Sequence, residues 1–221
     1  MKGEPRTFVW DLPTRLFHWV LAVLVSISIT TGLLGGFEIM DYHMLSGYGI
    51  LTLVVFRLVW GLVGNQHARF ASFIQGPSAI RHYLQQLRGQ RPATPHVGHN
   101  PLGGLSVLAL LATLLVQAGT GLFTTDDIML EGPLLHLVSD NTSGKLTALH
   151  TNLAWGIMGL VLLHLLAIGY YWLARADNLV LPMLTGWRRL AITPNASNPW
   201  LRGLLAFCVI AAGVYYLVTY V

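Results

Sequence analysis

Residues 149–166 read LHTNLAWGIMGLVLLHLL, an apolar run interrupted by two histidines, His150 and His164, 14 residues apart. Fourteen residues turn an α-helix by about 1400°, which is about 40° short of four full turns, and advance it by about 21 Å. The two imidazoles therefore share one helix face but lie at two depths, too far apart to bind the same metal ion. An ionisable side chain at membrane depth is a candidate for function.

The composition of the whole chain is that of a membrane protein. Of its 221 residues, 54% are hydrophobic and only 10% are charged, whereas soluble domains carry about 25% charged residues. The chain has a single cysteine. This excludes cysteine-based zinc sites, iron–sulfur clusters and the covalent C-x-x-C-H attachment of haem.

Five runs have roughly the 20 apolar residues that a helix needs to cross a bilayer. Lipid offers no hydrogen-bond partners to the backbone, so spanning segments of this kind are helices. We predict an all-α integral membrane protein with spans at about Leu16–Phe37, His43–Gly64, Leu102–Phe123, Leu146–Leu173 and Gly203–Val221. Asp11 is expected to cap the first of them, with Pro13 in its first turn.

Basic residues are distributed unequally among the connections. The N-terminal arm and the connections after the second and fourth spans hold Lys2, Arg6, Arg15, Arg69, Arg81, Arg88, Arg91, Arg175, Arg188, Arg189 and Arg202. The other two connections hold one base and six acids, namely Lys145 against Glu38, Asp41, Asp126, Asp127, Glu131 and Asp140. The positive-inside rule predicts a cytoplasmic N-terminus and a periplasmic C-terminus. The dispersed bases predict contact with a lipid membrane and no nucleic-acid partner.

The long connection over residues 65–98 is predicted to lie on the cytoplasmic side. Its middle, Pro77–Leu87, has the pattern of a short amphipathic helix, with Ile80, Tyr83, Leu84 and Leu87 on one side. Such a helix is expected to lie on the membrane surface.

Two further histidines match the first two in depth. His18 is placed near the cytoplasmic face, at the level of His164, and His43 near the periplasmic face, at the level of His150. Two stacked histidine pairs are what two b-type haems require, because each iron takes two axial imidazoles and the porphyrin lies between helices. A zinc or copper transporter would add acid or thiol ligands at these depths. Unrelated core histidines are the remaining alternative.

Glycines and one arginine fit a haem bundle. A flat macrocycle needs helix faces without side chains, which points to Gly32 and Gly47 and, with less weight, to Gly61, Gly104 and Gly119. The alternative is ordinary small-residue helix packing. Arg57 lies 14 residues beyond His43 at the cytoplasmic level, where a haem propionate could pair with it. Otherwise Arg57 would extend its charge to the headgroups.

Several motifs, taken in order, resemble one family. They are VWDLPTRLFHW (9–19), YHMLSGYGILTLVVFRLVWG (42–61), HARFASFIQGP (67–77), GHNPLGGLSVLALL (98–111) and TALHTNLAW (147–155). Together with His164 they resemble the bacterial dihaem cytochrome b561 family, which includes the b-type cytochrome subunit of nickel–iron hydrogenases. The resemblance implies a four-helix bundle, residues 1–175, that holds two non-covalent haems on His18, His43, His150 and His164. Residues 176–221 would form a cytoplasmic linker and a fifth, C-terminal transmembrane helix.

The resemblance also implies a function. The protein would transfer electrons across the bacterial inner membrane between the quinone pool and a periplasmic c-type cytochrome or hydrogenase. A self-contained superoxide:quinone oxidoreductase is an alternative, and a non-haem transporter or structural protein is a third. The quinone is expected at the cytoplasmic level, although a periplasmic site using His136 would also fit. His67, His82, His96 and His99 are expected to be solvated or to lie at a haem edge, and a homodimer is left open.

Overall fold

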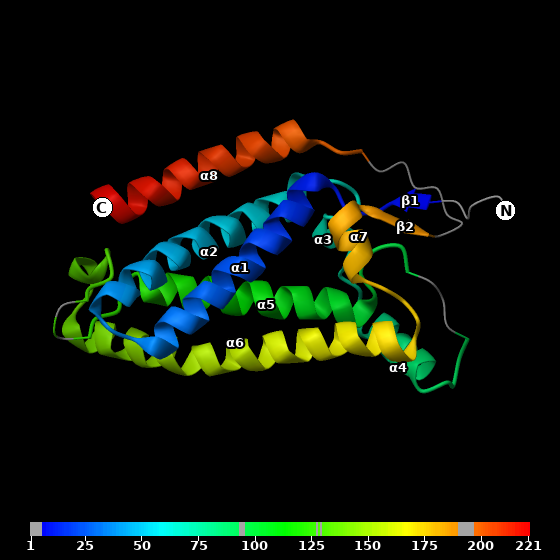
Figure 1. The fold of residues 1–221 in the computed structure, drawn as a ribbon, viewed down its shortest axis with the longest axis horizontal. Coiled ribbons are helices and arrows are strands. Elements are labelled where there is room, and N and C mark those ends of the chain that lie inside the picture. The colour runs from blue at the N-terminus through cyan, green and yellow to red at the C-terminus, as the bar shows by residue number, and fades with distance from the viewer. Residues whose placement is uncertain (1–5, 93–95, 127, 129, 190–196) are drawn as a thin grey trace.

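The fold is almost entirely helical (Figure 1). The computed structural model describes residues 6–92, 96–126, 128, 130–189 and 197–221; Lys2 and Asp127 of the charge comparison lie outside these ranges. Five helices are long and apolar enough to cross a membrane: α1 (Leu12–Leu34), α2 (Phe37–Val63), α5 (Pro101–Gly121), α6 (Asp140–Ala174) and α8 (Trp200–Tyr220). The predicted all-α integral membrane fold is confirmed.

The helix boundaries differ from the predicted spans in instructive ways. Asp11 caps α1 as predicted, its Oδ1 accepting a hydrogen bond of 2.8 Å from the backbone N–H of Thr14. The first span was predicted to reach Phe37, but the chain turns at Gly35 and Gly36, both with positive φ, and Phe37 begins α2. His43 therefore lies in the second turn of α2, and the prediction that it begins the helix is wrong.

The helix α2 is the centre of the bundle. In its most apolar window 56% of the residues are buried, against 6% in α1 and in α6. It packs against α1 on one side and α5 on another, and α5 packs against α6. The core between them is built from large side chains, including Phe17, Val54, Trp60, Leu114 and Ile157. The fifth helix, α8, lies along the outside of α2 (Figure 1).

One end of the bundle, called here the N-terminal end, carries most of the short elements (Figure 1). Strand β1 (Arg6–Phe8) pairs antiparallel with β2 (Trp187–Arg189). The short helix α7 (Val180–Thr185) lies beside the start of α1, where its carbonyls accept hydrogen bonds from Arg15 and Trp19. Part of the predicted linker is thus tied to the bundle, whereas the domain boundary near residue 175 stays a prediction.

The predicted amphipathic helix is present as α4 (Pro77–Leu87), preceded by the one-turn helix α3 (Phe70–Phe73). The side chain of Tyr83 is buried, and its hydroxyl bonds to the hydroxyl of Tyr171 on α6. Tyr171 also accepts a hydrogen bond of 3.1 Å from the side chain of Asn100, which caps α5. Tyr83 thereby joins α4 to two spanning helices.

The other end of the bundle, called here the opposite end, holds the α1–α2 turn and the loop between α5 and α6. That loop contains an isolated β-bridge between Thr125 and Glu131 and the 3-10 helix η1 (Leu135–Leu137). The carboxylate of Asp126 accepts hydrogen bonds from the backbone N–H groups of Ile128 and Leu130, which closes the loop tip on itself.

Candidate functional site

His43 on α2 and His150 on α6 face each other near the opposite end. Their ring centres are 6.0 Å apart. The Nδ1 atom of His43 lies 2.9 Å from the carbonyl oxygen of Ser28 on α1, and that of His150 lies 2.9 Å from the carbonyl oxygen of Gln117 on α5. A carbonyl can only accept, so each Nδ1 carries the proton and each Nε2 keeps its lone pair for a metal.

A cavity of about 410 Å³ surrounds this pair and is lined by all four helices of the bundle. Its size and apolar lining are those of a cofactor pocket. Besides the two imidazoles, its wall includes Gly32, Gly47 and Gly121, and it reaches Glu131 in the loop between α5 and α6.

The glycines fall into two groups. A Cβ at Gly32 would lie 3.0 Å from Cε1 of His43, and one at Gly121 would lie 2.9 Å from Cε1 of His150, so these two glycines make room for the imidazoles. Gly47 lines the cavity and has nothing within 4 Å of its Cβ position, as expected for a face kept clear for a macrocycle; Gly119 is similarly open.

Two of the other glycines serve packing. A Cβ at Gly61 would lie 2.1 Å from the ring of Phe70, and one at Gly104 would lie 2.8 Å from the carbonyl oxygen of Phe73. The small-residue packing alternative holds for these two positions. Their absent side chains let the segment that contains α3 lie directly on α2 and α5.

His18 on α1 and His164 on α6 form the second facing pair, with ring centres 6.3 Å apart. A metal–imidazole bond is about 2 Å long and the ring centre lies roughly 1 Å behind the bonding nitrogen, so two imidazoles on opposite sides of one metal ion have ring centres about 6 Å apart. Both pairs fit a single ion held between them. Among the described residues no group of three or more His, Cys, Asp or Glu side chains could hold a metal ion. A metal bound by imidazoles alone here needs further ligands, and a porphyrin supplies them.

Arg57 lies inside the bundle, with 2% of its side chain exposed. Burial inside the bundle argues against the alternative in which the side chain extends to the headgroups. Its guanidinium lies 5.0 Å from the centre of the Phe70 ring, a cation–π contact. Its Nη1 is buried and has no hydrogen-bond partner. A buried cation of this kind needs an acceptor, which fits a haem carboxylate.

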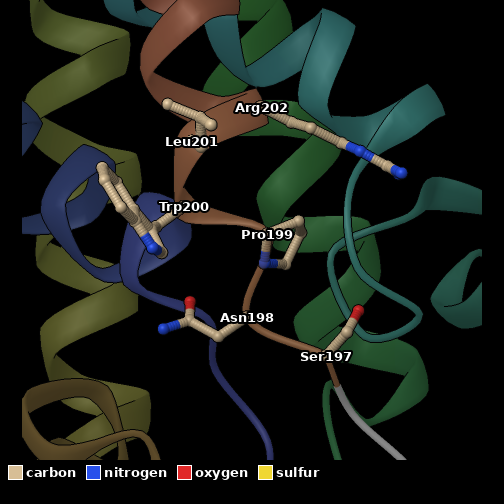
Figure 2. Close-up of a pocket in the computed structure, with 6 residues that line it drawn as sticks. All are labelled: Ser197, Asn198, Pro199, Trp200, Leu201 and Arg202. Carbon is tan, nitrogen blue, oxygen red and sulfur yellow. The ribbon is translucent and has the colours of Figure 1, made fainter.

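A second pocket, of about 390 Å³, lies at the start of α8 and is lined by residues 197–202 (Figure 2). The segment is anchored to the bundle by two hydrogen bonds, from Leu12 N–H to Asn198 and from Asn65 to the carbonyl of Ser197. None of the four histidines lines this pocket, and it contributes nothing to the paired-histidine site.

The sequence did not single out Gly121 or the carbonyls of Ser28 and Gln117. Gly121 ends α5 at the level of His150, and a comparison of depths along the third span could have found it. The carbonyl contacts depend on helix rotation and have no signal in the sequence.

Histidines that face each other inside a transmembrane helical bundle are the arrangement of a membrane cytochrome of b type, in which haem is held without covalent attachment. The sequence matches the prokaryotic cytochrome b561 family over residues 9–186. The chain belongs to this family, which makes it a multi-pass membrane protein of electron transport that uses b-type haem.

Curated relatives point the same way. The chain is 25% identical to the probable Ni/Fe-hydrogenase B-type cytochrome subunit of Rhodobacter capsulatus, over 85% of this chain and 83% of the relative. It is 23% identical to the probable Ni/Fe-hydrogenase 1 B-type cytochrome subunit of Escherichia coli K12, over 82% and 90%. With the Bradyrhizobium diazoefficiens subunit it shares 25% identity over 55% of this chain, and the match spans 60% of that relative. No solved structure is significantly similar to the chain.

Proposed function

We propose that this protein carries electrons across the bacterial inner membrane, between the quinone pool and a periplasmic redox partner. Two haems would be held at two levels, one by His18 and His164 and one by His43 and His150. Haem bound in this way supplies one-electron oxidation and reduction. The chain's own contribution is to hold the imidazoles in place, exclude water and set the local charge.

The observation that carries this proposal is the pair of ring distances, 6.3 Å at the N-terminal end and 6.0 Å at the opposite end. Two sites stacked along one bundle provide two relay points through the bilayer. The backbone carbonyls that accept from His43 and His150 fix the ring tautomer at one level. The buried charge of Arg57 belongs to the other level.

The orientation is part of the proposal. The distribution of basic residues supports a cytoplasmic N-terminal end and a periplasmic opposite end. The periplasmic partner would then dock beside the His43–His150 level. The acids described there, Glu38, Asp41, Asp126, Glu131 and Asp140, are all exposed, and they favour a partner with a basic patch.

The partner class rests on the relatives, which are named as hydrogenase cytochrome subunits. The chain spans only about half to three-fifths of the length of the Bradyrhizobium and Azotobacter relatives. The partner is therefore proposed as a hydrogenase or a c-type cytochrome. Family membership decides against the non-haem transporter. No contact among the described residues favours a superoxide:quinone oxidoreductase, and the quinone site stays a prediction at the cytoplasmic level.

The test is electron transfer across sealed vesicles that contain the purified protein in one orientation. Quinol in the membrane should reduce a membrane-impermeant acceptor on the side of the membrane that faces the opposite end of the bundle, next to His43 and His150. His18→Ala and His43→Ala should each abolish the transfer, and His82→Ala, at an exposed position on α4, should not. Transfer that survives the loss of either histidine would contradict the proposal.

A further inference from the structure

Five side chains at the N-terminal end have a buried nitrogen atom without a hydrogen-bond partner: Nε of Arg15, Nδ1 of His18, Nη1 of Arg57, Nε2 of His67 and Nδ1 of His99. The last three lie on α2 and in the connection between α2 and α5. His67 and His99 were expected to be solvated or to lie at a haem edge. They are partly exposed as residues, but these nitrogen atoms are sealed from solvent. Leaving a buried polar group unpaired costs about 1–3 kcal/mol, and more for a charged group.

The three side chains belong to one neighbourhood. The ring of Phe73 lies 4.5 Å from the ring of His99 and 5.9 Å from the guanidinium carbon of Arg57. A Cβ at Gly98, next to His99 in the chain, would lie 3.7 Å from Nδ1 of His67. Burial, followed by the positive charge of Arg57, lowers the pKa of His99 to about 3. His99 is therefore neutral and has one N–H to donate.

The neighbourhood has donors but no free acid. Asp11 is the nearby carboxylate, since its charge acts on His67. Its Oδ1 already accepts from the backbone of Thr14, and its Oδ2 accepts from Nε1 of Trp60 at 3.3 Å. Among the described residues the one ion pair joins Arg188 to Asp177. No acid of this part of the chain therefore lies within ion-pair distance of Arg57.

We propose that Arg57, His67 and His99 form a carboxylate receptor that holds the propionate groups of the haem bound between His18 and His164. A guanidinium can hold a carboxylate with two parallel hydrogen bonds, and each neutral imidazole adds one donor. The receptor satisfies the three unpartnered nitrogens together and surrounds the carboxylates with positive charge and N–H dipoles. The inference rests on the proposed function, and it adds His67 and His99 as donors beside Arg57.

The test is a redox titration of both haems in the purified protein and in variants of the two histidines. His67→Leu and His99→Leu remove a donor, His67→Gln and His99→Gln keep one, and His82→Leu is the control at an exposed position. With the donor gone, the carboxylate charge is less compensated and the oxidised iron is favoured. Each Leu variant should raise the oxidised-to-reduced ratio of one haem about tenfold at a fixed ambient potential, a shift of about 59 mV.

The second haem is the internal control for folding, and its potential should not move. Recovery of the wild-type potential in the Gln variants would support a donor role. Equal effects of Gln and Leu would overturn it in favour of packing, and so would unchanged potentials and haem content in the His67→Leu/His99→Leu double variant. A wild-type protein with no haem at this level would overturn the proposed function and this inference with it. If the wild type holds both haems and the variants leave the haem potentials unchanged, the inference alone would be overturned.

Discussion

The backbone of Gly32 on α1 lies directly against the imidazole of His43 on α2, where an added Cβ would be 3.0 Å from Cε1 and 3.1 Å from Nδ1. The same ring is held from one side by the carbonyl of Ser28, one turn earlier on α1. The position of His43 is thus set by two features of α1, the carbonyl group of Ser28 and the absence of a side chain at Gly32.

Gly32→Ala should weaken haem retention at the His43 level about tenfold, because the methyl group displaces the ring from its carbonyl partner. Transfer of haem to an excess of apomyoglobin measures this directly. Gly213→Ala on α8, where nothing lies within 4 Å of the Cβ position, is the matched control and should retain haem like the wild type. Equal retention in both variants would show that ring position is not set by Gly32.

Replacing one histidine of a pair should remove one haem and leave the other. His43→Ala and His150→Ala should lose the haem of the opposite end, and His18→Ala and His164→Ala the haem of the N-terminal end. Pyridine haemochrome analysis, normalised to protein, should give half the wild-type haem in each variant. Wild-type haem content in all four variants would refute the assignment of ligands.

Arg57→Leu should lower the potential of the haem at the N-terminal end, because reduction adds negative charge that the guanidinium stabilises. The haem-free protein should respond in the other direction. Removing an unpaired buried charge should raise its free energy of unfolding by about 1–2 kcal/mol, even after loss of the contact with Phe70. Redox titration and denaturant unfolding of the apoprotein measure the two effects. A variant with unchanged potentials would leave Arg57 with no part in haem binding.

The hydrogen bond between Tyr83 and Tyr171 should fasten α4 to the bundle. Tyr83→Phe should lower the free energy that holds α4 against the bundle by about 1 kcal/mol. Trypsin should then cleave faster at Arg81 and Arg88. Tyr215→Phe, at an exposed site on α8, is the control and should not change the cleavage rate. Burial, and then the bond to Tyr171, raise the pKa of Tyr83.

This shift has a consequence at high pH. A raised pKa in the folded state means that the neutral hydroxyl stabilises the fold. That contribution is complete below the unfolded value of about 10 and is lost as pH rises through the higher folded value. The difference in tyrosinate absorbance between the wild type and Tyr83→Phe should therefore appear only above about pH 10. A difference that appears below this pH would contradict the assignment.

Docking of a basic periplasmic partner should depend on salt. Oxidation of the reduced protein by a basic c-type cytochrome, followed by stopped flow, should slow severalfold between 0.1 and 1 M salt, as the screening length falls from about 10 Å to about 3 Å. Glu131→Gln and Asp126→Asn should reduce the salt dependence of the rate. The asparagine side chain keeps an oxygen that can accept the backbone hydrogen bonds of Ile128 and Leu130. A rate indifferent to salt and to both substitutions would exclude electrostatic docking.

The spanning helices and the facing of the histidines could be predicted because both depend on local periodicity. Length and hydropathy locate a span, and a fixed rise per residue converts spacing into depth. The start of α6 at Asp140 was missed because its first turns are polar and Ser139 caps them, and hydropathy does not register a helix that extends beyond the lipid. The turn at Gly35–Gly36 was missed because the apolar run continues through it.

Features that depend on distant contacts could not be predicted. The strands β1 and β2 are three residues each, too short for a periodic pattern, and their pairing depends on where α7 returns. His99 lies in a polar connection, and the rings of Trp10 and Phe73 that pack against it bury its Nδ1 atom. A histidine in such a connection carries no sequence sign of whether its ring is solvated.

The pairing of β1 with β2 also sets an order of events during synthesis. Phe8 pairs with Trp187, roughly 180 residues later in the chain, which at about 5–20 residues per second is a delay of about 10–40 s. For that time α1 is already made while the strand and the short helix that cover its start do not yet exist. The N-terminal end of the bundle can therefore close only after α1, α2, α5 and α6 have all been made.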